Sequence, residues 1–500
     1  ALVPFGVGNE ALKQMGKTVE AWTHVENLET RVPFYRIRVL IDDSSEVREE
    51  KRGNFHLAMG GDPRRPELLP VVVDPVAVFG EDTTFRFPER YGDALPASGQ
   101  AQQYANRTPC AFSVQSRVLP PGGKCSFVTL TGAAPDVKVL NALLPEILDP
   151  GYPGRKAEEN RILTARLMHR AFTVSGSAVF DAYVRQSFLD NILRGGFPHS
   201  LAEGPLARVL YLYSRKHGDL ERDYNNFVLQ PVYFSQGNGN FRDIVQNRRN
   251  DVWVNPAVGP SNIIHFLNLI QLDGHNPLVV KGLRYTLNPD AAGRLRTSLG
   301  GELHDRIRTL LEGSFVPGEL VDILRQSGKA RDEELGSLLA DILPCCESEE
   351  AADHGEGYWV DHWCYILDLV ESYARLFPER LAALLWEEES VVWYDDCHHV
   401  RPVHEKYVLH EGLVRQYGAV AFDKEKSAVI RARTRHPHRV RDREGRICRE
   451  SVFVKLAVLS FVKLSLLDAH NTGLEMDADK PGWNDSLNGL PGLLGSALPE

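Results

Sequence analysis

The sequence feature that most constrains the fold is a change in hydrophobic period near residue 136. From about residue 30 to 135, short runs of β-branched and aromatic residues alternate with Pro, Gly and Asp, as in the segments 31–43, 67–80 and 125–134. This pattern is typical of strands joined by tight turns. Beyond residue 136 the apolar residues recur with a period near 3.6, which predicts helices. The sequence therefore predicts an antiparallel β-sandwich, or the later part of one, followed by helices.

Two helices have clear start and stop signals. In "SNIIHFLNLIQLDG" we expect Ser261 to cap the first turn and Gly274 to end the helix. In "DHWCYILDLVESYARLFPE" an apolar stripe runs from Trp363 to Tyr373, and Pro378 follows its end. Since no strand pattern alternates with the helical segments from 155 to 475, we predict an all-helical domain with functional loops.

The segments 263–272 and 452–467 are apolar on most faces, as expected of an inner layer wrapped by other helices. This indicates a helical barrel. The longest apolar run, 451–467, is interrupted by Lys455 and Lys463 and is shorter than the roughly 20 residues of a membrane-spanning helix. We therefore predict a buried helix there.

The chain is long enough for more than one domain. We expect a β-sandwich domain over 1–135, a helical linker over 136–195 and a catalytic helical domain over 196–500.

The formal net charge of −10 argues against a nucleic-acid partner, because such binding depends on a clustered basic face. The seven cysteines form no regular disulfide framework, and Cys345 and Cys346 are adjacent. The N-terminal residues do not resemble a signal peptide. We therefore expect a cytoplasmic protein.

A zinc site is an alternative use of some cysteines. Cys364 lies near His362, and Cys397 is followed by His398 and His399. Neither group has the ligand pairs at spacings such as C-x-x-C that tetrahedral zinc sites usually show. The prediction is that the protein holds no metal and needs no cofactor.

The segment 431–450 is rich in arginine and contains His436 and His438. It fits either an anion-binding site or a solvent-exposed loop with a hairpin at "DREGR". We favour the solvated hairpin, because runs of charge usually face water.

Four segments combine aromatic and ionisable residues on predicted loops, a mixture that sugar sites require. Rings stack on the apolar faces of a pyranose, and planar polar groups bind its hydroxyls. The segments are 217–227 ("HGDLERDYNNF"), 237–253 ("GNGNFRDIVQNRRNDVW"), 355–363 ("GEGYWVDHW") and 476–496 ("MDADKPGWNDSLNGLPGLLGS").

In the second segment, Arg242 and Asp243 are adjacent, and Gln246 and Asn247 follow one helical turn later. These side chains can form a fork of donors and acceptors for sugar hydroxyls. The alternative is a capped helix start with an exposed ion pair. In the third segment, Asp361 either caps the following helix or points into a pocket with Trp359 and His362.

In the last segment, Trp483 and Asp485 are one residue apart. An Asx turn would explain the aspartate but not the tryptophan. A general acid in glycosidic cleavage benefits from an apolar neighbour that raises its pKa and keeps it protonated.

Together, "YSRKHGDLERDYNNF", "GNFRDIVQN", "GYWVDHW" and "KPGWNDSLNGLPGL" resemble the cellobiose-phosphorylase-like inverting glycoside phosphorylases. In three of these segments, the residues of the motifs "NFRD", "WVDHW" and "GWNDSLNGLPG" look closest to those of the large β-1,3-glucan phosphorylases. The resemblance covers residues 200–496 in its motifs. It implies a β-sandwich, a helical linker and an (α/α)6 barrel that is incomplete at its C-terminal end, and it suggests a homodimer.

Carried over residue by residue, the aspartate of the family's W-N-D motif falls on Asp485, which would protonate the glycosidic oxygen. The tryptophan falls on Trp483, at the wall of the sugar subsite. The family's R-D pair falls on Arg242 and Asp243, which would hold hydroxyls of the transferred glucosyl unit. In "WVDHW", Asp361 and His362 would join the same subsite.

The resemblance implies cleavage of a β-gluco-oligosaccharide or β-glucan by inorganic phosphate, with inversion, to α-glucose 1-phosphate. Phosphate is already anionic near neutral pH, so one carboxylic acid suffices. The family's phosphate-binding residues come after the W-N-D loop, so we expect this sequence to be part of a longer enzyme.

Two alternatives remain open. An inverting β-glucan hydrolase would need a second carboxylate, for which Asp361, Glu356 and Glu405 are candidates. A non-catalytic carbohydrate-binding protein is the other.

Overall fold

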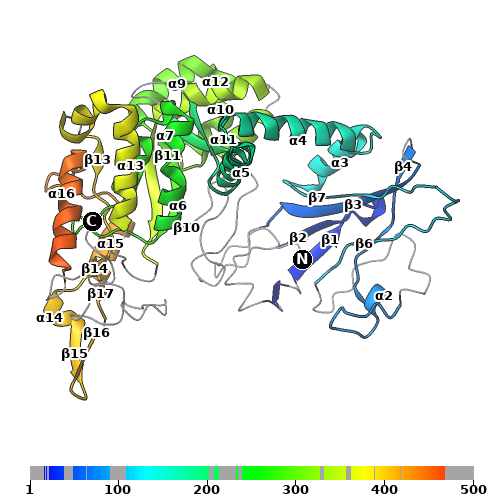
Figure 1. Cartoon of the computed structure of the whole chain (residues 1–500), viewed down its shortest axis with the longest axis horizontal. Coiled ribbons are helices and arrows are strands. Elements are labelled where there is room, and N and C mark those ends of the chain that lie inside the picture. Colours follow the sequence, from blue (N-terminus) through cyan, green and yellow to red (C-terminus); the bar gives the residue numbers. More distant parts are fainter. Residues whose placement is uncertain are drawn as a thin grey trace. The chain divides into compact units, whose positions relative to one another are not determined.

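The computed structural model has mixed α and β content, and its chain divides into two compact units (Figure 1). One unit comprises residues 1–169 and 226–231, and the other residues 170–225 and 232–500. The boundary at 169/170 lies within the predicted helical linker. The structure describes residues 16, 18–19, 22–38, 49–62, 65–90, 108–201, 208–212, 232–234, 239–326, 332–355, 358, 362–387, 389–416 and 418–467.

The first unit is built on an antiparallel sheet in the order β1-β2-β3-β4, with β7 also paired to β3. Alternate residues of β3, Phe55, Leu57 and Met59, share a hydrophobic core with Leu140 and Ile147 of α3. Asp136 caps α3 by accepting a hydrogen bond from the Val139 amide. The strands and helices of this unit are β1 (Thr23–Glu26), β2 (Phe34–Ile37), β3 (Gly53–Asp62), β4 (Arg65–Leu68), β5 (Val71–Val72), α2 (Val76–Phe79), β6 (Phe112–Ser113), β7 (Val128–Ala134), α3 (Val137–Ile147) and α4 (Tyr152–His169).

The predicted antiparallel strands of this unit are therefore confirmed. Of the predicted strand segments, 125–134 contains β7 and 31–43 contains β2, whereas 67–80 contains the end of β4, the two-residue strand β5 and the short helix α2. Within the described ranges, β5 and β6 form a separate two-stranded sheet. The complete β-sandwich remains a prediction.

The second unit contains strands as well as helices, so the prediction of an all-helical domain is wrong. Its helices are α5 (Ala178–Gly195), α6 (Phe241–Arg248), α7 (Asp251–Val254), α8 (Ser261–Leu267), α9 (Ala292–Leu299), α10 (Gly301–Leu311), α11 (Pro317–Gln326), α12 (Asp332–Ile342), α13 (His362–Leu376), α14 (Val403–Lys406), α15 (Lys424–Ala432) and α16 (Val452–Ser465). Its strands are β8 (Phe197–Leu201), β9 (Arg208–Leu212), β10 (Gly239–Asn240), β11 (Val279–Leu287), β12 (Cys346–Asp353), β13 (Val391–Val392), β14 (His398–Val400), β15 (Tyr407–His410), β16 (Leu413–Gln416), β17 (Val420–Phe422) and β18 (Arg449–Glu450).

These strands form several small antiparallel sheets, of which β10-β11-β12 is the three-stranded one. One hydrophobic core joins α6, α8, α13 and α16. A second core joins α9 to α12 and the far half of β11. In Figure 1, α9, α10 and α12 cluster at one end of this unit. The described helices do not form a closed barrel, so the (α/α)6 architecture stays a prediction.

Both individually predicted helices are found, and one of them, α8, has ends that differ from the prediction. Helix α13 ends at Leu376, before Pro378. Ile366 and Tyr373 of the predicted apolar stripe are buried, whereas its other members, Trp363, Leu367 and Val370, are half-buried; Leu369, which was not part of the predicted stripe, is buried as well. Helix α8 ends at Leu267, short of Gly274, and its N-cap is Pro260, so the predicted cap by Ser261 is wrong. Tight turns after Leu267 end this helix early.

Helix α16 is buried on one face only. Val452, Lys455, Leu459 and Lys463 are buried, whereas Phe461 is 69% exposed. The prediction of a helix buried on most faces is therefore wrong, and the two lysines belong to its buried face. Of the helices in the described ranges, none has the length and apolar character that crossing a bilayer requires.

Candidate functional site

The predicted Arg242–Asp243 pair lies at the first turn of α6. Strand β10 ends at Asn240, whose side chain caps the helix by accepting a 2.9 Å hydrogen bond from the Arg242 amide. Arg242 Nε lies 3.3 Å from Asp243 Oδ1, and the two side chains are 25% and 27% exposed. The cap and the ion pair of the alternative interpretation are thus both present, but the pair is half-buried. Gln246 is exposed one turn later, on the face of Arg242.

The sheet brings a second predicted segment to the same place. Asn240 of β10 is opposite Val279 of β11, which is in turn opposite Asp353 of β12. Strands β10 and β12 therefore both end at the border of the sheet where β11 begins. From this border, β10 continues into α6, and β12 is followed in the sequence by residues 354–361 and then by α13. We call this border the β10/β12 edge.

Helices α6 and α13 pack side by side (Figure 1). Phe241, at the start of α6, belongs to the same core as Ile366 and Leu369 of α13. Near the end of α6, Arg249 Nη1 lies 3.5 Å from Asp368 Oδ2. The two helices therefore pack against each other and contribute to one core.

Tyr358 anchors the segment between β12 and α13. Its side chain is buried, and its hydroxyl accepts a 2.8 Å hydrogen bond from Gln271 Nε2 and donates one of 3.1 Å to the His398 carbonyl oxygen. Burial raises the pKa of this phenol. The first aromatic residue of "YWVDHW" is therefore a fixed structural support.

The other predicted site residues lie outside the described residues. These are Asp361, Trp483 and Asp485, and the side chain of His362, whose backbone begins α13. The segment 217–227 also lies outside. Of the candidates for a second carboxylate, Glu405 is exposed on α14, where its Oε2 lies 3.6 Å from Arg401 Nη1.

A cavity of about 630 Å³ opens where β12 ends. Asp353, His354 and Gly355 form one side of it, and its lining further includes Tyr394, Asp396, Cys397, His398, Phe422, Ser427, Arg431, Arg433 and His438. The imidazole of His354 stacks on that of His398 with ring centroids 4.1 Å apart. This cavity, which we call the edge cavity, adjoins the β10/β12 edge.

Several ionisable side chains line the edge cavity. Burial alone would raise the pKa of Asp396, but the hydrogen bonds and charge of His398 outweigh it and lower that pKa to about 2. Arg433 Nη1 lies 2.6 Å from Asp395 Oδ2, directly beside it. The sequence analysis does not assign Asp395, Asp396 or Arg433 to a site; the run of ionisable side chains in "YDDCHH" is the local signal for the two aspartates.

The segment 431–450 is only partly the solvated hairpin that we favoured. The turn at "DREGR" is present, with Asp442 and Arg446 exchanging hydrogen bonds. Arg433 and Arg439 instead point inward, where Arg439 pairs with the buried Glu350. His436 Nε2 lies 2.5 Å from Glu347 Oε2. The solvated interpretation is therefore wrong for these residues, because carboxylates pair with them, of which Glu350 and Asp395 are buried.

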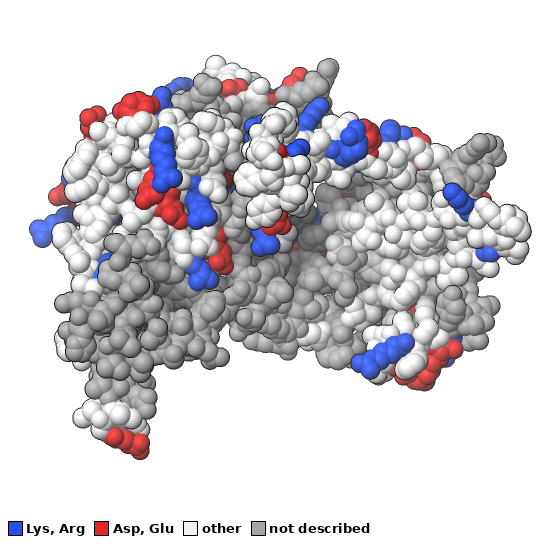
Figure 2. Space-filling model, in the orientation of Figure 1, with Lys and Arg blue, Asp and Glu red and all other residues white. Residues whose placement is uncertain are grey.

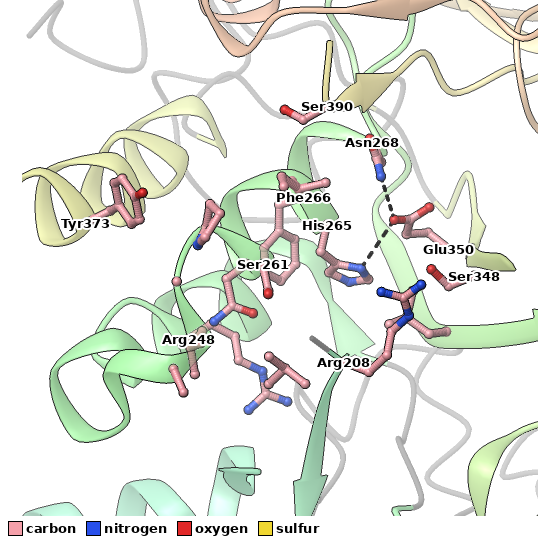
Figure 3. A pocket seen from close by; sticks show the side chains of 18 of the residues that line it. Arg208, Arg248, Ser261, His265, Phe266, Asn268, Ser348, Glu350, Tyr373 and Ser390 are labelled. Carbon is pink, nitrogen blue, oxygen red and sulfur yellow. Dashed lines mark hydrogen bonds and ion pairs between the residues drawn. The ribbon is translucent and has the colours of Figure 1, made fainter. Parts of the chain in front are cut away.

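A larger cavity, of about 1000 Å³, lies at the other end of α6 (Figure 3). It is lined by Ile244 and Arg248 of α6 and by Tyr373 and Phe377 at the end of α13. Figure 3 shows His265 pointing toward Glu350, with 3.7 Å between Nδ1 and Oε1. None of the predicted site residues is among its lining in the described ranges.

A buried polar cluster lies beside this larger cavity. Tyr211 Oη and Asn262 Nδ2 lie 2.9 and 3.0 Å from Asp251 Oδ2, and the Arg248 guanidinium lies over the Tyr211 ring. Burial raises the pKa of Asp251 to about 6, although Arg248 opposes this shift. The cluster fixes α7 against α6 and α8.

A scan of the sequence against protein-family models gives no match, and a search of curated proteins gives none either.

Proposed function

We propose that the protein is an inverting glycoside phosphorylase that cleaves β-linked gluco-oligosaccharides with inorganic phosphate and releases α-glucose 1-phosphate. The observation that supports this proposal is the β10/β12 edge. Two predicted sugar-binding segments, more than 100 residues apart in the chain, start at that one edge of a sheet. Sugar sites need such convergence, because each ring is contacted on several sides.

In this proposal Arg242 and Asp243 hold hydroxyls of the glucosyl unit. The guanidinium supplies donors and the carboxylate acceptors, and half-burial leaves both side chains accessible while limiting their rotamers. Gln246, on the same helix face, offers an amide farther from the edge. Asp361 and His362 are proposed to complete this subsite.

Asp485 is proposed as the general acid, and Trp483 as the apolar wall that keeps it protonated. Cleavage then needs protonation of the glycosidic oxygen by one carboxylic acid and attack by phosphate on the opposite face of the sugar. No general base is required, because phosphate is already an anion. The proposal involves no metal or other cofactor.

The family resemblance also supplies the larger architecture that we propose. It consists of a β-sandwich, a helical linker and an (α/α)6 barrel whose phosphate-binding residues follow the W-N-D loop. We also propose a homodimer and, because the cysteines lack a disulfide framework, a cytoplasmic location. On the face that Figure 2 shows, basic and acidic side chains of the described residues are interspersed, which agrees with a neutral sugar rather than a polyanion as substrate.

Substitution of Asp485 separates a catalyst from a sugar-binding protein. We would express the complete reading frame that encodes this chain and compare Asp485→Asn with Asp479→Asn, a matched change in the same segment. Asp485→Asn is expected to lower the rate of phosphorolysis by about 10²- to 10⁴-fold and to retain oligosaccharide binding. Equal turnover in the two variants would overturn the role of Asp485, and binding without turnover in the unmodified protein would indicate a non-catalytic carbohydrate-binding protein.

A further inference from the structure

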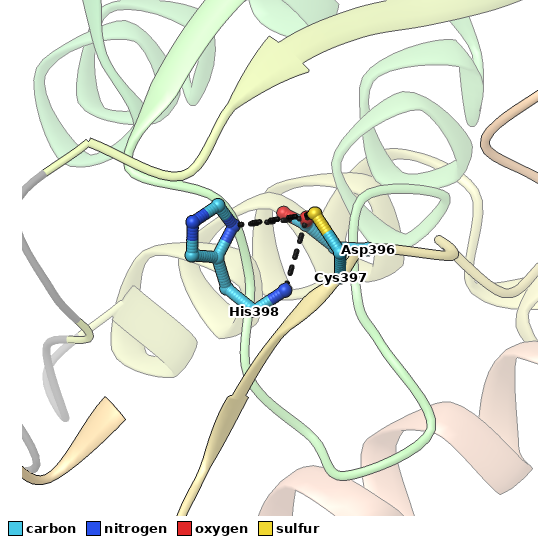
Figure 4. Close-up of side chains that lie close together, drawn as sticks. All are labelled: Asp396, Cys397 and His398. Atoms are coloured by element: carbon cyan, nitrogen blue, oxygen red, sulfur yellow. Dashed lines mark hydrogen bonds and ion pairs between the residues drawn. The ribbon is translucent and has the colours of Figure 1, made fainter. Parts of the chain in front are cut away.

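Three successive side chains, those of Asp396, Cys397 and His398, converge on one point at the wall of the edge cavity (Figure 4). His398 Nδ1 lies 3.1 Å from Asp396 Oδ1, Cys397 Sγ lies 3.3 Å from the same oxygen, and Sγ and Nδ1 are 3.8 Å apart. Successive residues of an extended strand point to opposite faces, so this convergence requires a local turn.

Asp396 produces that turn. Its Oδ1 accepts a 3.2 Å hydrogen bond from the backbone amide of His398, which folds the chain back over the carboxylate. His398 then enters β14, where it is paired with Phe422 of β17. The imidazole is further held by its stacking on His354. The three donor atoms are therefore positioned by the fold before any ligand arrives.

The triangle of donor atoms has the dimensions of one face of a tetrahedral metal site. Zinc binds carboxylate oxygen and imidazole nitrogen at about 2.0–2.2 Å and thiolate sulfur at about 2.3 Å. In a tetrahedron, bonds of this length place neighbouring ligand atoms roughly 3.3–3.7 Å apart. The observed separations of 3.1, 3.3 and 3.8 Å lie close to this range.

We propose that Asp396 Oδ1, Cys397 Sγ and His398 Nδ1 bind a thiophilic divalent cation of the Zn²⁺ class. The fourth position faces the edge cavity, which is roomy enough for water or another ligand. Carboxylate and thiolate together balance the charge of the ion, so no net charge is placed beside the buried Asp396 side chain. Binding displaces the thiol proton of Cys397 into solvent, because the thiolate is the ligand.

This inference is independent of the proposed phosphorylase activity. It also revises the expectation that the "DCHH" run holds no metal, which rested on the absence of spaced ligand pairs. Here a turn within three consecutive residues brings the donor atoms close together, as the two intervening residues of a C-x-x-C motif do in other metal sites.

Cobalt is the probe for the test. The chain, freed of metal with a chelator and kept reduced by a phosphine, is titrated with Co²⁺ while its absorption spectrum is recorded. We expect one equivalent to bind, with a sulfur-to-cobalt charge-transfer band in the near ultraviolet and the visible bands of tetrahedral Co²⁺. Addition of Zn²⁺ should abolish both.

Variants assign the ligands. Cys397→Ser should lose the charge-transfer band, and Asp396→Asn and His398→Ala should each weaken binding at least about tenfold, the loss produced even by outer partners of a metal site. His399→Ala changes the adjacent, exposed residue of β14, and Cys125→Ser removes an exposed thiol of the other unit. Both should bind as the unmodified chain does.

Circular dichroism establishes that each variant is folded. A charge-transfer band that survives Cys397→Ser but disappears in Cys125→Ser would overturn the site, as would a folded, unmodified chain that shows no such band. If Cys397→Ser does not fold, unchanged affinity in both Asp396→Asn and His398→Ala would overturn the proposal equally.

Discussion

Lys455 of α16 is completely buried, at 0% exposure, within the core of the second unit. Its ammonium group donates hydrogen bonds to the carbonyl oxygens of Leu267, Ile270 and Val392, and lies 4.3 Å from the centre of the Trp393 ring. Burial lowers its pKa well below the ordinary value of lysine. This one side chain therefore joins α16 to the end of α8 and to β13.

We predict that Lys455→Ala lowers the free energy of unfolding by about 2–5 kcal/mol, because it leaves a cavity and removes the hydrogen bonds that buried carbonyl oxygens accept from this side chain. Urea unfolding followed by circular dichroism measures the change. Lys424→Ala, at an exposed position of α15, is the control and should change the free energy by less than about 0.5 kcal/mol. A Lys455→Ala variant as stable as this control would contradict the assignment.

Glu350 is a second residue on which the core depends. It is 4% exposed on β12, pairs with Arg439 and accepts a 2.9 Å hydrogen bond from Asn268 Nδ2. Burial alone would raise the pKa of this carboxyl, but Arg439 and His265 outweigh burial and lower it well below 4.5. The stability that the carboxylate contributes is therefore present above pH 4.5 and is lost as the pH falls toward the lowered pKa.

Glu350→Gln should lower the free energy of unfolding at pH 7 by about 3–5 kcal/mol, because it leaves the Arg439 charge buried without its partner. The difference from the unmodified protein should shrink as the pH falls from 4.5 to 3. Urea unfolding at several pH values provides the measurement, with the exposed Glu405→Gln as control. A difference that is the same at every pH would show that ionisation of Glu350 does not stabilise the fold.

At the scale of elements, helix α13 was predictable and strand β12 was not. The α13 sequence has a stripe of large apolar residues at helical spacing and a proline beyond its end, so local signals suffice. The β12 sequence, "CESEEAAD", lacks β-branched residues, and only pairing with β11 and the inward bonds of Glu350 make it a strand. The strand conformation of β12 is therefore determined by contacts with residues distant in the sequence, not by its own residues.

The end of β12 depends on Gly355, which has a φ of +86°. A Cβ atom added there would lie 2.8 Å from the Cβ of Leu278. Gly355→Ala should therefore destabilise the protein by about 2 kcal/mol or more, through backbone strain and overlap. Gly313→Ala is the matched control, since its nearest neighbour would be the Leu310 carbonyl oxygen at 3.7 Å. Equal thermal midpoints for the two variants would refute the claim that this turn needs glycine.

At the scale of the whole molecule, the change of period at residue 136 predicted the order of the chain but not the composition of the second unit. The strands there are short and pair with distant partners, so they leave little periodic signal. The site follows the same rule. Arg242 and Asp243 were recognisable from their local sequence, whereas the edge cavity is made by β12, β14 and the 431–450 segment, which only the fold brings together.

The central claim is that the two segments at the β10/β12 edge serve phosphorolysis of a β-glucan. The most direct measurement uses the protein from the complete reading frame, incubated with a β-linked gluco-oligosaccharide with and without inorganic phosphate, and identifies the products by proton NMR. We predict that α-glucose 1-phosphate forms when phosphate is present and that no sugar is released without it. Release of free glucose at equal rates in both incubations, with no glucose 1-phosphate, would contradict the account and identify a hydrolase.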